Sequence, residues 1–232
     1  MKALLESVNL DYKYSLNTLS SPVNVYLKVT GTCDLRCTFC SQYNEKVYNM
    51  PIDSAKKLLK ELKDIGVISI TYTGGEPLFS SRIEDFVKHI KDMGYLIKLD
   101  TNGSFPERLK TLLDKGYLDY VAMDIKGFHE IYGDVIGIKN FSVYLVKQSL
   151  EVLKNSGVAY ELRTTFIKPL HTKENVEMMA KEIRGEHRYF LQNYRQAEAM
   201  KNAHYESFSK EEMEEFLKTI QIYLPNARLR EI

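Results

Sequence analysis

The sequence has 232 residues, of which 44% are hydrophobic and 27% are charged, so the chain can bury a core and stay in solution. The net charge of +1 gives no field of one sign that would indicate a nucleic acid or an acidic membrane as partner. No window approaches the roughly 20 apolar residues that a membrane span needs. The first residues include Glu6 and Asp11 and do not resemble a signal peptide. We therefore expect a cytoplasmic protein that binds neither nucleic acid nor membrane.

Strand-like and helix-like segments alternate along the chain. Strands are predicted at residues 24–31, 69–75, 96–103, 119–127, 159–167 and 189–194. Helices are predicted at residues 53–66, 81–94, 106–116, 143–157, 173–184 and 210–224, whereas residues 129–140 are expected to be irregular. Six strand–helix units require parallel strands, so the pattern indicates an α/β fold, either an open doubly wound sheet or an incomplete barrel.

Helix ends carry their own signals in this sequence. Asp53 is expected to cap the first helix and Gly66 to end it, with a buried face formed by Ala55, Leu58, Leu59, Leu62 and Ile65. Capping boxes are predicted at Ser81 with Glu84 and at Ser209 with Glu212. No linker divides the chain, so we expect a single domain over residues 1–232, with a core at about 24–196 and a helical extension at 197–232.

The distinctive residues of the sequence follow the predicted strands. In both candidate architectures ligands bind at the carboxyl ends of parallel strands. Three cysteines follow the first predicted strand, and the other strand-end residues are Gly74 to Pro77, Asp100 to Gly103, Asp124, Lys126 and Arg163. This shared position predicts one active site.

The three cysteines, Cys33, Cys37 and Cys40, are the only ones in the chain and lie within eight positions. A structural zinc site usually needs four ligands, and no second cysteine pair is present. Thiolates suit an iron–sulfur cluster, and a four-iron cluster held by three cysteines leaves one iron open to a ligand. Two alternatives remain: three small core residues, or a zinc site that a histidine completes.

The segment "CDLRCTFC" has the spacing C-x3-C-x2-C, with Phe39 before the last cysteine, and it resembles the cluster loop of the radical S-adenosylmethionine (radical SAM) enzymes. The resemblance covers about residues 24 to 196. It implies a partial (β/α)6 barrel and a [4Fe–4S] cluster on Cys33, Cys37 and Cys40. It also implies S-adenosylmethionine as cofactor, reductive cleavage to a 5′-deoxyadenosyl radical, and an electron donor such as flavodoxin or ferredoxin.

The segment "TGGEP", Thr73 to Pro77, resembles the GGEP segment of the same family. Its two glycines, Gly74 and Gly75, let a backbone approach a ligand closely. The resemblance implies that the exposed strand-end carbonyls and Glu76 accept hydrogen bonds from the ammonium group of the cofactor. The alternative is an ordinary turn from a strand to a loop.

"LDTNG" and "MDIK" are similar to segments of the glycyl-radical-enzyme activases, in particular the pyruvate formate-lyase and anaerobic ribonucleotide reductase activating enzymes. The resemblance implies a monovalent cation held by Asp100, Thr101 and Asp124, with the Ala122 carbonyl as a further ligand. It also implies cofactor-binding roles for Phe39, Asn102, Lys126, Arg163 and Arg195. Lys126 and Arg163 would neutralise a carboxylate; alternatively they are strand-end charges paired with Asp124.

The chain departs from the activases directly after the last cysteine, where Ser41, Gln42 and Tyr43 replace the usual His-Asn-Pro. Two hypotheses about function follow. In the first, an anaerobic activase abstracts a hydrogen atom from a glycine of a partner glycyl radical enzyme. In the second, a radical SAM enzyme modifies a small molecule or a peptide, as the 7-carboxy-7-deazaguanine synthases do. A non-catalytic metal-binding or interaction domain is a third, from another class.

Overall fold

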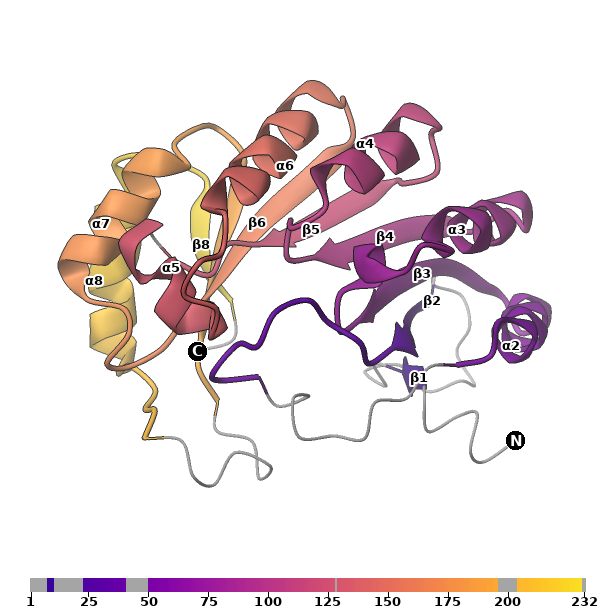
Figure 1. Cartoon of the computed structure of the whole chain (residues 1–232), viewed down its shortest axis with the longest axis horizontal. Helices are drawn as coiled ribbons and strands as arrows, with labels where there is room; N and C mark the ends of the chain where they lie inside the picture. The colour runs from indigo at the N-terminus through magenta and orange to yellow at the C-terminus, as the bar shows by residue number, and fades with distance from the viewer. Residues whose placement is uncertain (1–7, 11–22, 41–49, 128, 196–203, 231–232) are drawn as a thin grey trace. The chain divides into compact units, whose positions relative to one another are not determined.

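The structure is a computed structural model that describes residues 8–10, 23–40, 50–127, 129–195 and 204–230 (Figure 1). The chain falls into two compact units, which we describe separately. Among the described residues, the first unit contains 8–10, 23–34, 50–121 and 149–159. The second contains 35–40, 122–127, 129–148, 160–195 and 204–230. No helix in the described part of the chain is both long and apolar enough to cross a bilayer.

The first unit contains strands β1 (Val8–Leu10), β2 (Val23–Thr30), β3 (Val67–Gly74) and β4 (Leu96–Thr101). β1 is antiparallel to β2, whereas β2, β3 and β4 run parallel. The register pairs the last residue of β2 with the last residue of β3. The carboxyl ends of these two strands therefore lie side by side, at the point where the cysteine-containing segment begins.

The helices of the first unit follow its strands. They are α2 (Ile52–Asp64), the short 3-10 helix η2 (Pro77–Phe79), α3 (Ile83–Asp92) and α4 (Pro106–Asp114). Each of α2, α3 and α4 buries one apolar face, because its apolar residues recur every three or four positions. The buried residues of α3, for example, are Ile83, Phe86, Val87 and Ile90.

The second unit contains the parallel strands β6 (Ala159–Phe166), β7 (Arg188–Asn193) and β8 (Ala227–Arg230). Its helices are α5 (His129–Ile136), α7 (Lys173–Glu182) and α8 (Lys210–Gln221). Three elements contain residues of both units: β5 (Tyr120–Asp124), α6 (Val143–Asn155) and, through its first residue, β6. The Phe216 ring of α8 lies 5.5 Å from Phe166 and 4.8 Å from Phe208, centroid to centroid, and thereby fixes this helix to the core.

The six predicted strand–helix units are all present between β2 and α8, so the predicted α/β class is confirmed. Two strands were missed. β1 lies near the start of the chain, and β8 lies within the stretch that was expected to be purely helical. The segment at residues 129–140, expected to be irregular, begins with the helix α5.

Several predicted helix ends were wrong. Pro51 occupies the N-cap of α2, and Asp53 lies in the first turn. Ile65 follows α2 and is 47% exposed, so it does not belong to the buried face. At α3 the N-cap is Arg82, and the side-chain hydrogen bond of the predicted box with Ser81 is not formed.

Two other end signals are confirmed. Ser209 and Glu212 form the predicted capping box of α8. Gly66 has a φ of +87° directly after α2, a conformation that favours glycine.

A bidentate ion pair attaches β8 to the second unit. Arg230 donates two hydrogen bonds of 2.9 Å to Glu161 of β6, whose side chain is only 4% exposed. The Arg230 guanidinium also lies 3.6 Å from the centroid of the Phe190 ring. Such a pair is costly to break, because removal of one partner leaves the other charge buried without compensation.

We predict that Arg230→Ala lowers the free energy of unfolding by about 2–4 kcal/mol, since the buried Glu161 carboxylate then loses the two hydrogen bonds that Arg230 donates. The matched control is Arg228→Ala, two residues away on β8 and exposed, which should change it by less than about 0.5 kcal/mol. Urea denaturation of the three proteins measures both values. Equal losses of the free energy of unfolding in the two variants would contradict a stabilising role for the Arg230–Glu161 ion pair.

Candidate functional site

The two glycines of "TGGEP" approach the backbone of the segment that leads to Cys33. The amide of Gly75 donates to the Thr30 carbonyl at 2.8 Å, and the amide of Glu76 donates to the Thr32 carbonyl at 2.9 Å. A Cβ atom on Gly74 or Gly75 would overlap these same carbonyls. The two glycines therefore let two backbone segments of the protein approach each other closely. This contact fixes the segment directly before Cys33.

Glu76 is a buried carboxyl group that joins the end of β4 to the start of η2 in the first unit. Its side chain is 1% exposed and accepts hydrogen bonds from the Thr101 hydroxyl at 2.8 Å, the Asn102 amide at 2.7 Å and the Leu78 amide at 3.0 Å. Burial raises the pKa of Glu76 to about 8, although these three donors oppose the shift. The described contacts of Glu76 thus give it a structural role at the ends of β3 and β4.

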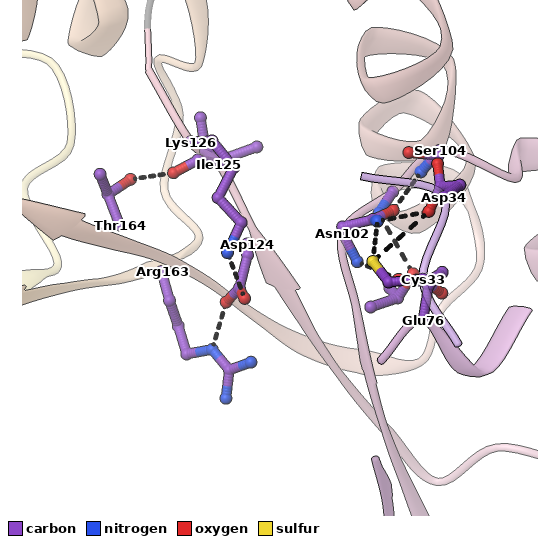
Figure 2. Close-up of polar contacts among 12 residues, drawn as sticks. Cys33, Asp34, Glu76, Asn102, Ser104, Asp124, Ile125, Lys126, Arg163 and Thr164 are labelled. Carbon is purple, nitrogen blue, oxygen red and sulfur yellow. Dashed lines mark hydrogen bonds and ion pairs between the residues drawn. The ribbon is translucent and has the colours of Figure 1, made fainter. Parts of the chain in front are cut away.

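Asn102 connects the end of β4 with the first cysteine, as Figure 2 shows. Its side-chain amide donates to Asp34 at 2.9 Å and lies 3.9 Å from the sulfur of Cys33. Its side-chain oxygen accepts from the Ser104 amide at 2.9 Å, which fixes the orientation of the group. Cys33 therefore has an N–H donor beside its sulfur, an arrangement that stabilises a thiolate or a metal-bound sulfur.

In the second unit, one carboxylate lies between two cations (Figure 2). Asp124 accepts from Lys126 at 2.9 Å and from the Arg163 side chain at 2.8 Å. Burial alone would raise the pKa of Asp124, but Arg163 and Lys126 outweigh it and hold this pKa at about 2. Burial would lower the pKa of Lys126, and Asp124 reverses that shift, so the pKa is raised. All three groups are charged at neutral pH, and together they carry one net positive charge.

Cys37 and Cys40 lie in a tight turn of the second unit. The amide of Cys40 donates to the carbonyl of Cys37 at 3.0 Å, and Lys126 lies 5.7 Å from the centroid of the Phe39 ring. Burial raises the pKa of the Cys37 thiol, while the nearby Lys126 cation opposes the shift. A cation beside this sulfur favours its thiolate form, which is the form that binds a metal.

The remaining predicted site residues are placed as follows. The Asp100 side chain is 15% exposed and lies 4.0 Å from Lys98, and the Thr101 hydroxyl also accepts from the Gly103 amide at 3.1 Å. Pro77 is buried at the start of η2, and Arg195 is exposed just after β7. Ser41 and Gln42 lie outside the described residues. The predicted cofactor and cation contacts of these residues stay predictions.

A model of the radical SAM superfamily matches residues 27–184, which is more than half of the chain. The chain belongs to the radical SAM superfamily. Membership implies a [4Fe–4S] cluster and S-adenosylmethionine as cofactors, as the resemblance of the cysteine segment implied.

Curated relatives within the superfamily differ in length and activity. "Putative glycyl-radical enzyme activating enzyme MJ1227" of Methanocaldococcus jannaschii is 25% identical, over 100% of this chain and 98% of that protein. The PqqA peptide cyclase of Bradyrhizobium diazoefficiens is 34% identical over 143 residues, which are 59% of this chain and 36% of the cyclase. A 7-carboxy-7-deazaguanine synthase of M. jannaschii is 28% identical over 44% of this chain and 46% of the synthase. The chain thus spans less than half of the last two relatives.

Solved radical SAM structures share the fold. Streptococcus suis SuiB bound to S-adenosylmethionine matches with a TM-score of 0.71 at 18% identity, over 93% of this chain and 52% of SuiB. A radical SAM methyltransferase from Sphaerobacter thermophilus matches with a TM-score of 0.73 at 14% identity, over 90% of this chain and 66% of the methyltransferase. These likenesses confirm the predicted radical SAM core fold.

The cysteines of this radical SAM protein are chemically suited to the cluster that the family implies. All three are free thiols with partial exposure, and none forms a disulfide. An amide donor lies beside the sulfur of Cys33, and a cation lies near Cys37. Within the described ranges, no three His, Cys, Asp or Glu side chains are already grouped around a metal position. The three cysteines therefore fit a cluster in the type of atom that they offer, which is a thiol sulfur, and in the donor and the cation that lie beside two of them.

Sequence reasoning did not single out His171. The ring is 2% exposed; its Nδ1 accepts from the Ile167 amide at 3.2 Å, and its Nε2 lies 3.2 Å from the Lys126 carbonyl. Because Nδ1 accepts, the proton is assigned to Nε2, which donates to that carbonyl. His171 thereby fixes the backbone of Lys126. The only sequence signal was its position in "PLHT", just after the predicted fifth strand.

We predict that His171 makes the protein sensitive to acid. Burial lowers the pKa of His171 to about 4, whereas an unfolded histidine titrates near pH 6.5. Between these values the unfolded state binds more protons, so the free energy of unfolding falls as the pH drops, by up to about 3 kcal/mol in total.

Denaturation with urea at pH 6.5 and pH 4.5 measures the loss. His171→Leu should remove this part of the pH dependence, whereas His204→Gln at an exposed position should keep it. Titration of His171 near pH 6.5 by NMR would contradict the prediction.

Proposed function

We propose that this radical SAM protein is a glycyl-radical-enzyme activase, with an anaerobic ribonucleotide reductase as the type of partner. It would work anaerobically in the cytoplasm and would take its electron from a flavodoxin or a ferredoxin. The observation that carries the proposal is the end-to-end match to the M. jannaschii relative named as an activating enzyme, which covers 100% of this chain and 98% of that protein.

The residues of the chain have distinct tasks in this proposal. When bound, the reduced cluster and S-adenosylmethionine supply methionine and a 5′-deoxyadenosyl radical, which becomes 5′-deoxyadenosine when it takes a hydrogen atom from the Cα of a glycine. Cys33, Cys37 and Cys40 would hold the cluster, and Asn102 would donate a hydrogen bond beside Cys33. Further cofactor contacts are assigned to Phe39, the Gly74–Pro77 backbone, Asp100 and Arg195.

The ion pairs of the second unit support a carboxylate-binding role near the cofactor. Asp124 holds Lys126 and Arg163 in place, and the three groups keep one net positive charge. A fixed positive group can bind the methionine carboxylate without loss of side-chain freedom at the moment of binding. The monovalent cation proposed at Asp100, Thr101 and Asp124 has the least support, because Asp124 already contacts two cations and Thr101 is bonded to Glu76.

A second candidate function is the modification of a peptide or a small molecule. It is favoured by the partial match to PqqA peptide cyclase, whose 34% identity exceeds that of the full-length relative. It is also favoured by the match to 7-carboxy-7-deazaguanine synthase. The segment "TGTCDLRCTFC" also resembles radical SAM enzymes that modify small molecules or peptides, and the residues directly after it depart from the activases.

Anaerobic reconstitution should load about four iron and four sulfide ions per chain, as expected for a [4Fe–4S] cluster. Cys33→Ala, Cys37→Ala and Cys40→Ala should each abolish the brown cluster absorbance, since each removes one of the only three thiolates. Ser104→Ala, close to Asn102 but without a metal-binding atom, is the control and should load normally. Stoichiometric zinc in place of iron would contradict the cluster.

The activase itself is tested with a partner. Reduced protein, S-adenosylmethionine and an anaerobic ribonucleotide reductase should together give a glycyl doublet in electron paramagnetic resonance. If the radical-loop glycine of the partner carries deuterium at Cα, that deuterium should appear in 5′-deoxyadenosine. A partner in which alanine replaces this glycine is the matched control and should give neither signal.

The two candidate functions differ in what accompanies 5′-deoxyadenosine. For the activase, its formation depends on the partner protein, and no modified small molecule accumulates. Formation in step with a modified peptide or small molecule, together with no doublet on any partner, would overturn the activase and support the second candidate. Absence of S-adenosylmethionine cleavage in every mixture would contradict both.

A further inference from the structure

The carboxyl end of α5 binds the backbone of the cysteine loop, which we define as residues 35–40. The amide of Arg36 donates to the Ile136 carbonyl at 3.0 Å, and the amide of Thr38 donates to the Val135 carbonyl at 3.2 Å. The Thr38 hydroxyl lies 3.3 Å from the same Val135 carbonyl. The last carbonyls of a helix have no partner within the helix, so α5 has acceptors to offer at this end. The residues on both sides of Cys37 are thereby held.

Gly137 ends α5 and allows the cysteine loop to approach. Its φ of +69° lies in the region that favours glycine, and the Ile138 amide closes the helix end by donating to the Gly133 carbonyl at 3.0 Å. A Cβ on Gly137 would overlap the carbonyl oxygen of Arg36 and press on the Arg36 side chain. Glycine is therefore required here for two separate reasons, and one of them concerns the cysteine loop directly.

The helix that holds the loop is itself firmly packed. Val135 and Ile136 are fully buried, and Tyr132 is 1% exposed with its ring stacked on Phe141 at 5.7 Å and 10°. Gly133 also faces backbone, since a Cβ there would lie 3.0 Å from the Ile138 carbonyl oxygen. A short helix fixed in this way can hold a loop that has no regular structure of its own.

We infer that α5 and Gly137 are positioning elements for the iron–sulfur cluster, acting through the backbone on each side of Cys37. This inference rests on membership of the radical SAM superfamily and does not depend on which substrate the enzyme uses. A side chain at position 137 pushes the Arg36 carbonyl away and moves the Cys37 sulfur from its place. Residues that orient a metal ligand from behind commonly change metal affinity by about 10–100-fold when they are replaced.

The test compares Gly137→Ala with Gly157→Ala. Gly157 has a φ of +72°, nearly the same as Gly137, but a Cβ there meets nothing within 4 Å. Both variants therefore introduce the same kind of backbone strain, and only Gly137→Ala disturbs the cysteine loop. Each protein is purified, checked for folding by circular dichroism, reconstituted anaerobically, and then challenged with an iron chelator.

We expect Gly137→Ala to lose iron at least about tenfold faster than the wild type and to show altered g-values of the reduced cluster in electron paramagnetic resonance. Gly157→Ala should match the wild type in both measurements, even where its melting temperature falls. Unchanged iron retention and g-values in a folded Gly137→Ala variant would overturn the inference. Equal losses in both glycine variants would overturn it too, because strain alone would then explain them.

A second pair of variants, at Thr38, tests the same inference if Gly137→Ala does not fold. Thr38→Val removes the hydroxyl that contacts the Val135 carbonyl, whereas Thr38→Ser retains it. Thr38→Val should lose iron about fivefold faster, as expected for one lost hydrogen bond, and Thr38→Ser should restore the wild-type rate. Identical rates for Thr38→Val and the wild type would overturn the inference in that case. Because iron retention is measured without substrate, failure of the activase proposal would leave this result unaffected.

Discussion

The segment that carries the cysteines has no regular structure and has to be held by its neighbours, and this constraint governs much of the structure. The segment before Cys33 is bonded to the ends of β2 and β3 through Gly75 and Glu76. The residues on both sides of Cys37 are bonded to the end of α5. In both places backbone amides and carbonyls form the contact, and glycines without a Cβ make room for it. Helix and strand ends supply these groups because their outermost backbone groups lack internal partners.

Two carboxyl groups, the buried Glu76 and the half-buried Asp124, show how the surroundings decide a charge. Glu76 meets only neutral donors, and burial raises its pKa. Asp124 meets two cations, which lower its pKa in spite of burial. The first group is suited to holding loops together, and the second to keeping Lys126 and Arg163 charged and in place. Their different roles follow from the neighbours and not from the residue type.

The parts of the fold that repeat were predictable from sequence. Periodic apolar residues predicted the six strand–helix units. The candidate site residues were recognised because they follow the predicted strands. α5 was missed because Gly133 within it, Gly137 directly after it and its short length weaken the helical pattern, whereas packing through Tyr132 and Ile136 stabilises it. β8 was missed because four residues carry almost no periodic signal, and its stability depends on Glu161, 69 residues away.

The same limit applies to the candidate site. The cysteine spacing identified the family, because it is a local pattern. The distant partners of Glu76, Asn102 and His171 are Thr101, Cys33 and Lys126, which lie 25, 69 and 45 residues away along the chain, and no local pattern announces them. The capping box predicted at Ser81 failed for a related reason: the motif was present, but the helix began one residue later, after Arg82.

Glu76 also has a consequence for how substitutions combine. Its one carboxyl group is shared by Leu78 of η2 and by the neighbouring residues Thr101 and Asn102 at the end of β4, so two parts of the chain are coupled through it. When one donor is removed, the carboxyl group can shift toward the two donors that remain. When the carboxyl group is removed, all three donors lose their hydrogen bond to Glu76. The effects of substitutions at positions 76 and 101 on the free energy of unfolding should therefore not add. A double-mutant cycle would measure the difference as a coupling energy between the two residues.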